Sequence, residues 1–141
     1  MLDARLRPSF RLLHLVYGLV PIVAGLDKFA NILADWEAYL APWVAEMLPF
    51  SPGTFMALVG VIEIAAGILV LVKPRIGAWV VAIWLVAIAI NLILAGRYDV
   101  AVRDLVMACG AWVLARLAEA NEFAAAREKT PVGAERAGAR A

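Results

Sequence analysis

The chain has 141 residues, of which 65% are hydrophobic and 18% are charged, and its formal net charge is +1. A soluble domain is roughly half apolar and about a quarter charged, so this composition argues against a soluble globular protein. The sequence has no basic region interleaved with aromatic residues, as nucleic-acid binding would require, and none of the common motifs of soluble enzymes.

Four apolar stretches, each close to the length that crosses a bilayer, fill most of the chain. They cover residues 10–30, 53–72, 76–95 and 100–117. A membrane-spanning helix needs about 20 residues, and in lipid its backbone must satisfy its own hydrogen bonds. We therefore predict an all-α integral membrane four-helix bundle over residues 10–127. A cytoplasmic N-terminal segment, 1–9, precedes it, and a disordered cytoplasmic tail, 128–141, follows.

The distribution of charge predicts the orientation of the bundle. Lysine and arginine precede the first stretch, occupy the turn at 73–75 and follow the fourth stretch, whereas residues 31–52 carry only acidic charges. Positive charge in short loops stays cytoplasmic, so both termini and the turn at 73–75 are expected inside. The compartment expected from this pattern is a bacterial-type inner membrane.

The first stretch carries a face of small residues with a basic residue near each end. This face holds His14, Gly18, Pro21, Gly25 and Lys28. Pro21 is expected to kink the helix or to leave a carbonyl free. His14 raises the hypothesis of a haem ligand, although the second ligand would have to come from Met or another protomer. The alternative for His14 is a hydrogen bond to a neighbouring group.

The connection after the first stretch is predicted to form one short amphipathic helix over residues 35–48. Its apolar and aromatic residues recur at a spacing of three to four. We expect this helix to lie in the membrane interface, with its aromatic side chains at the depth of the headgroups. The alternative is a lid that packs on the bundle without contacting lipid.

Glu63 is the most informative residue, because it lies near the middle of the second apolar stretch. A carboxylate in hydrocarbon is costly, so it must be paired, protonated or in contact with water. Gly60 and Gly67 share its helical face, and small residues allow another helix to approach closely. Glu63 should therefore point toward a neighbouring helix.

Four further polar residues are expected in the outer half of the bundle, near Glu63. They are Lys28, Asn91, Arg103 and Asp104. The long side chains of lysine and arginine could reach Glu63, and Arg103 could also pair with Asp99 one turn before it. The resulting network is either a structural ion pair that fixes the helix register or a site that handles a ligand or a proton. Cys109, the only cysteine, is expected to pack as a small apolar residue.

Two stretches resemble the DoxX-like family of small four-span bacterial membrane proteins. In residues 17–29, Gly18 and the run Ala24-Gly25-Leu26-Asp27-Lys28-Phe29 look like that family's glycine pair closed by a lysine. Residues 60–69 look like its Glu-x-x-x-Gly helix, with the basic turn 73–75 after it, and residues 98–105 show a weaker similarity. The similarity in architecture covers about residues 10–118.

The resemblance implies a membrane subunit near respiratory or redox chemistry. Some members of the family are associated with thiosulfate–quinone oxidoreduction, and others with resistance to oxidative stress. It marks Lys28 and Glu63 as important positions without giving either a catalytic role.

Three functions remain compatible with the sequence. The first is an accessory or structural subunit, whose partners would be the lipid bilayer and either other membrane subunits or further copies of the chain. The second is a redox subunit that binds a quinone or another lipophilic ligand, with Glu63 handling a proton and Lys28 or Arg103 holding the polar head. The third is a small transporter. The missing enzyme motifs argue against an enzyme acting on its own.

Overall fold

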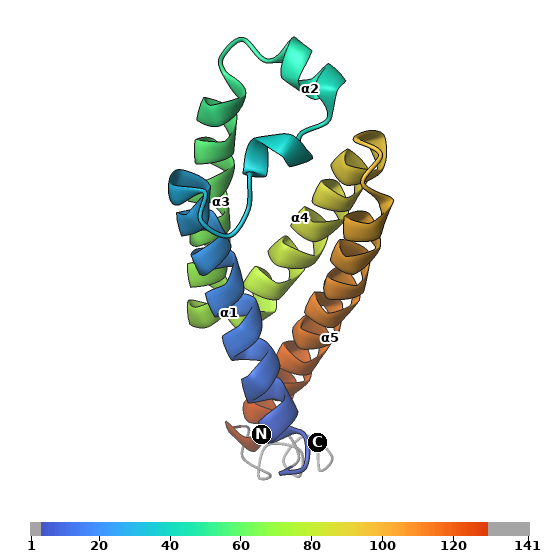
Figure 1. Cartoon of the computed structure of the whole chain (residues 1–141). Helices are drawn as coiled ribbons and strands as arrows, with labels where there is room; N and C mark the ends of the chain where they lie inside the picture. The colour runs from blue at the N-terminus through green and yellow to red at the C-terminus, as the bar shows by residue number, and fades with distance from the viewer. Residues whose placement is uncertain (1–3, 130–141) are drawn as a thin grey trace, which may run out of the picture.

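The computed structural model describes residues 4–129, and their regular elements are all helical (Figure 1). The elements are α1 (Arg7–Ala30), η1 (Trp36–Tyr39), α2 (Pro42–Met47), α3 (Pro52–Val72), α4 (Pro74–Leu94) and α5 (Tyr98–Lys129). The predicted all-α class is confirmed. Three helices, α1, α3 and α4, are long and apolar enough to cross a membrane, which indicates a helical membrane protein. From residue 130 onward, the tail predicted to be disordered lies outside the described residues.

Proline and backbone conformation set most of the helix boundaries. A proline occupies the first or second position of α1, α2, α3 and α4, where its missing N–H is not needed. The Ser51 hydroxyl also caps α3 by accepting a hydrogen bond from the backbone N–H of Thr54 at 3.2 Å. α1 continues through Pro21 without a break and ends at Ala30, and the next residue, Asn31, has a left-handed backbone conformation.

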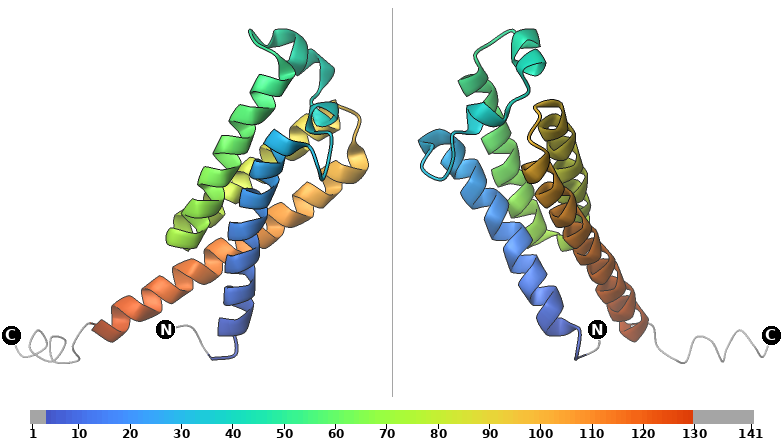
Figure 2. Two further views of the ribbon diagram at one scale, coloured as in Figure 1. Left: turned by 60° about the vertical axis from the view of Figure 1, so that its left-hand side comes forward. Right: turned by 45° about the vertical axis from the view of Figure 1, so that its right-hand side comes forward.

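The long helices pack as two pairs that diverge from one end of the bundle. α1 packs along α3, and α4 packs along α5. The two pairs meet near the connection between α3 and α4, at what we call the narrow end, and separate toward the other end (Figures 1 and 2). Residues 31–51, which we call the cap, lie over the wide end. The fold is therefore a V with a covered opening.

Glycines on facing helices bring α1 and α3 into backbone contact. A Cβ added to Gly67 would lie 2.5 Å from the carbonyl oxygen of Gly18, and one added to Gly25 would lie 2.5 Å from that of Gly60. A backbone oxygen cannot move aside as a flexible side chain can, so no larger residue fits at these crossings. The small-residue faces predicted for the first two stretches thus contact each other.

The narrow end is closed by a tightly packed, alanine-rich core. Its buried members are Ala66, Val70, Ala78, Val81, Ala82, Ala111, Leu114 and Ala115. A Cβ added to Gly77 would lie 2.4 Å from the Cα of Val70, so α4 starts in backbone contact with α3. Cys109 lies outside this core and is exposed, so its predicted packing is wrong. It faces outward because its neighbours Ala108 and Ala111 occupy the inward positions of α5.

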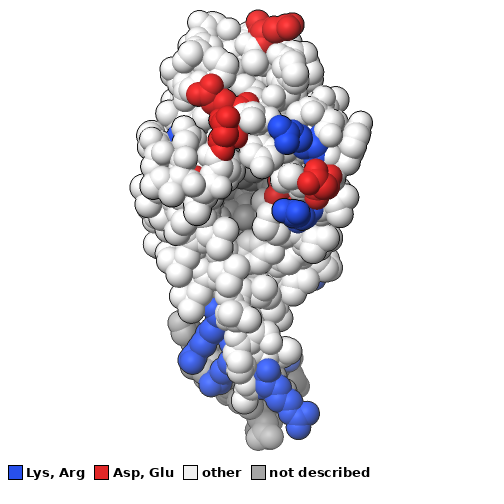
Figure 3. Space-filling model, in the orientation of Figure 1, with Lys and Arg blue, Asp and Glu red and all other residues white. Residues whose placement is uncertain are grey.

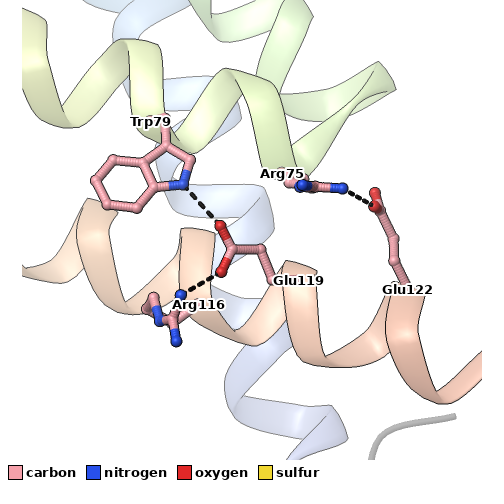
Figure 4. A network of polar contacts seen from close by, with 5 residues as sticks. All are labelled: Arg75, Trp79, Arg116, Glu119 and Glu122. Atoms are coloured by element: carbon pink, nitrogen blue, oxygen red, sulfur yellow. Dashed lines mark hydrogen bonds and ion pairs between the residues drawn. The ribbon is translucent and has the colours of Figure 1, made fainter.

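Polar side chains link α4 to α5 at the narrow end (Figure 4). The indole Nε1 of Trp79 donates to Glu119 at 2.9 Å, and Arg116 pairs with the same carboxylate. Arg75 donates to Glu122 at 3.1 Å. Exposed pairs of this kind stabilise a fold only slightly, so the core must supply most of the stability there.

The cap is not the single helix predicted over residues 35–48. It consists of η1 and α2, which are separated by Leu40 and Ala41. Ala41 is extended, with φ −62° and ψ 133°, because the ring of Pro42 disfavours a helical conformation in the residue before it. Both residues of the break are buried, so this part of the cap packs on the bundle, whereas α2 has no buried residue and Trp43 and Met47 are exposed.

The glycine contact between α1 and α3 generates a stability prediction. Gly67→Val should destabilise the fold by roughly 1–3 kcal/mol, because its side chain would meet the backbone of Gly18. The control is Ala65→Val, which enlarges an exposed residue of the same helix. Thermal unfolding in detergent, followed by circular dichroism, measures both. Equal melting temperatures for the two variants would contradict the contact.

Candidate functional site

A buried ion pair joins α1 to α3 in the wide half of the bundle. The ammonium Nζ of Lys28 lies 2.6 Å from the carboxylate Oε2 of Glu63, and both residues are less than one-tenth exposed. The two residues follow Gly25 and Gly60 by three positions, so the glycine crossing brings their helices close enough to pair. The structure therefore places Lys28 against Glu63, as the helical faces indicate.

Two residues that the sequence analysis missed hold the lysine in place. The Lys28 ammonium lies 3.7 Å from the ring centroid of Trp36, a distance at which a cation is attracted to the π face. The indole Nε1 of Trp36 in turn donates to Asp27 at 2.8 Å. Asp27 also accepts the backbone N–H groups of Ile32 and Leu33, so it fixes the chain reversal that begins the cap. The sequence feature that could have indicated this arrangement is the pair Asp27-Lys28 followed by Trp36.

Asp104 brings a second carboxylate to the ion pair. Asp104 is only 8% exposed, and its carboxylate lies close enough to interact electrostatically with both Glu63 and Lys28. Within the part of the chain that the structure describes, its side chain makes no hydrogen bond or salt bridge. When all three groups are ionised, the cluster carries one excess negative charge.

A cavity of about 630 Å³ lies between the two helix pairs, beneath the cap. Its walls are mostly apolar, and its polar lining includes Lys28, Glu63 and Asp104. Trp84 also lines it, and the indole Nε1 of Trp84 is buried without a hydrogen-bond partner among the described residues. The cavity therefore contains an acceptor, the Asp104 carboxylate, and a donor, the Trp84 indole N–H, that have no hydrogen-bond partner among the described residues. Buried polar groups normally have one.

The cavity opens between α1 and α5, which make few contacts with each other. Val16, Val20 and Met107 line it and are themselves partly exposed at the surface. Figure 3 shows a hollow on this face, with charged side chains beside its upper edge. Toward the narrow end the opening closes where the Tyr17 hydroxyl donates to the carbonyl oxygen of Met107 at 2.7 Å. Access is therefore lateral, through a gap between two helices.

Asn91 lines the cavity, but its hydrogen bonds hold the cap. Its Oδ1 accepts the backbone N–H of Ala41 at 3.1 Å, and its Nδ2 donates to the carbonyl oxygen of Tyr39 at 2.9 Å. These bonds satisfy the backbone at the break between η1 and α2. Asn91 is thus a support for the cap, with its amide group already bonded.

Arg103 and His14 lie outside the cluster. Arg103 is exposed because it lies on the outward face of α5. Among the described residues it pairs neither with Glu63 nor with Asp99. The Nε2 of His14 lies 2.9 Å from the carbonyl oxygen of Val70, which loses its helical donor because Pro74 has no N–H. His14 therefore completes the end of α3, in agreement with the hydrogen-bond alternative, and Nε2 is occupied by that contact.

The charge balance of the cluster predicts unequal effects of removing its members. Lys28→Met leaves two buried carboxylates without a cation and should cost about 3–5 kcal/mol of unfolding free energy. Glu63→Gln should cost less, because Asp104 remains available to Lys28. Denaturation in mixed micelles measures both, with the exposed Lys73→Met as control. A larger loss in Glu63→Gln than in Lys28→Met would contradict this arrangement.

Comparison with protein-family models gives no match, and comparisons with curated proteins and with solved structures give none either.

Proposed function

We propose that the chain is a four-span protein of a bacterial-type inner membrane and that its cavity binds a lipophilic small molecule. The binding site is the wide half of the bundle, between α1 and α5 and beneath the cap. The observation that carries this proposal is the cavity itself, which combines apolar walls with the Trp84 indole N–H and the Asp104 carboxylate, neither of which has a hydrogen-bond partner among the described residues. A guest molecule with a polar head and an apolar body would satisfy both features.

The surface of all four long helices supports contact with lipid. Leu19 on α1, Val61 on α3, Ile83 on α4 and Val106 on α5 are each more than half exposed. A soluble monomer rarely exposes so much continuous apolar surface. On this basis α5 is proposed as the fourth span, with Asp104 turned into the bundle and Arg103, near the outer end of the helix, exposed. A ligand dissolved in the bilayer would then reach the cavity through the lateral opening.

The distribution of charge supports the proposed orientation. Lysine and arginine cluster at the narrow end of the molecule, with a smaller group beside the hollow, and acidic side chains are prominent toward the cap (Figure 3). The positive-inside rule then puts the narrow end and both termini in the cytoplasm. The cavity and the ion pair of Lys28 and Glu63 consequently belong to the outer half of the membrane.

Ligand binding is compatible with the resemblance to DoxX-like proteins and with an accessory role. A subunit that holds a quinone or a related lipophile for a larger redox assembly would serve both. The cavity favours this role over a purely structural one, because an ion pair that only fixed helix register would need no adjacent space. Glu63, already bonded to Lys28, would act by neutralising the lysine at the edge of the site.

Photolabelling tests the proposed ligand site. In nanodiscs, a neutral long-chain alcohol carrying a diazirine should label cavity-lining segments of α1, α3 and α5. Ala24→Trp, which fills a small position in the cavity wall, should reduce this labelling severalfold. Mass spectrometry of the labelled peptides gives the readout.

The matched control is Val23→Trp, because Val23 is exposed on the same helix and does not line the cavity. The probe should label the cavity segments of this variant as strongly as those of the unmodified protein. If the label falls only on outward-facing residues and is the same in both variants, the cavity is not a ligand site.

Cysteine accessibility tests the orientation. In a Cys109→Ser background, a membrane-impermeant maleimide added to intact spheroplasts should modify Phe50→Cys in the cap. It should modify Lys73→Cys only after the membrane is permeabilised. The reverse pattern would show that the cap faces the cytoplasm.

A further inference from the structure

We infer that the cavity selects lipophilic cations, with Asp104 as the group that balances their charge. This inference rests on the proposed ligand-binding function and names the class of its ligand. It starts from the count of charges around the cavity. Lys28 is paired with Glu63 at 2.6 Å, so the only buried cation of the cluster is already bound to one carboxylate. Asp104 is left facing the same space.

The two arginines nearest to Asp104 in sequence do not supply the missing charge. Arg103 is exposed and makes no salt bridge within the described residues. Arg97 is also exposed, and it donates to the carbonyl oxygen of Ala38 at 3.3 Å while lying 5.2 Å from the ring of Tyr39. A buried carboxylate without a partner is unfavourable, and a cation bound in the cavity would complete it.

Aromatic side chains around the cavity suit a positive head group. Those that line it are Tyr17, Trp36, Tyr39, Phe55 and Trp84. Ring faces attract cations, and sites for quaternary ammonium groups are built from several such rings. The contact of Lys28 with Trp36 at 3.7 Å shows this interaction already operating at the edge of the cavity.

The composition of the remaining cavity walls favours an organic cation over a metal ion. A hard metal cation requires six or more oxygen ligands, whereas the described lining of the cavity offers two carboxylates, of which Glu63 is already bonded to Lys28, among mostly apolar neighbours. A space of about 630 Å³ accommodates a substantial hydrocarbon body. An amine or quaternary ammonium compound with an apolar chain matches the charge, the rings and the walls together.

A pair of photoreactive probes tests this selectivity. Both carry the same diazirine chain, and one ends in trimethylammonium whereas the other ends in hydroxyl. The protein is held in nanodiscs of zwitterionic lipid, and labelling of the cavity segments is divided by labelling of outward-facing segments. The unmodified protein should favour the cation, and Asp104→Asn should lower the cation-to-alcohol ratio roughly tenfold, as expected for loss of a charged partner.

Two further variants control for folding and for charge elsewhere. Asp104→Glu retains the carboxylate and should retain the preference for the cation. Asp99→Asn removes an exposed carboxylate from the first turn of α5 and should leave the ratio unchanged. Thermal unfolding of Asp104→Asn, Asp104→Glu and Asp99→Asn shows whether each variant is folded.

The outcomes separate the inference from the function on which it rests. If both probes label the cavity equally in the unmodified protein and in Asp104→Asn, the cavity binds lipophiles without charge selection and the inference is overturned. If neither probe labels the cavity, the proposed ligand site and the inference fail together. A preference for the cation that survives in Asp104→Asn would also overturn the role given to Asp104.

Discussion

The arrangement of the bundle depends on the buried contact between the Lys28 ammonium and the Glu63 carboxylate. Neither charge could be buried alone, because the cost of removing it from water would exceed any gain from packing. Their partnership requires α1 and α3 to lie closer than ordinary side chains permit. Gly25 and Gly60 provide that approach, since a Cβ on either one would meet the backbone of the other helix. The glycines set the distance between the helices, and the ion pair sets their register.

The ion pair also connects the membrane-embedded helices to the cap. Trp36 covers the Lys28 ammonium, and its indole is held by Asp27, which in turn binds the first backbone groups after α1. Asn91, on α4, holds the middle of the cap through the backbone of Tyr39 and Ala41. The cap is therefore attached to both helix pairs. It covers the space between them and positions one side of the cation at the same time.

The sequence predicts the helices and the inward position of Glu63, because both follow from periodicity and from the cost of charge in an apolar segment, but it left open whether Lys28 or Arg103 reaches that carboxylate. Glu63 shares a face with Gly60 and Gly67, so the helical repeat alone directs it toward a partner helix. The sequence analysis grouped Asp104 with Arg103 by depth alone, although the repeat puts neighbouring residues on different faces and Asp104 shares the buried face of α5 with Ala101 and Ala108.

The cap was harder to predict for a different physical reason. Apolar residues at a spacing of three to four indicate a helix over 35–48, but Pro42 extends the residue before it and divides the segment. The backbone groups released at that break then need partners, and they find Asn91, some 50 residues away in the chain. The roles of Asp27 and Trp36 likewise depend on a chain reversal that no local pattern specifies.

The cavity follows from packing at its two ends. At the narrow end, Gly77 against Val70 and the alanine-rich core hold the helix pairs in close contact, and the pairs diverge beyond that point (Figures 1 and 2). At the wide end, the cap spans the gap between the pairs and is bonded to α1 through Asp27 and to α4 through Asn91. Closing the space with apolar side chains would bury Asp104 against hydrocarbon with no cation to balance it. An open, lined cavity is therefore the arrangement that this set of charges permits, and a guest of opposite charge is what would complete it.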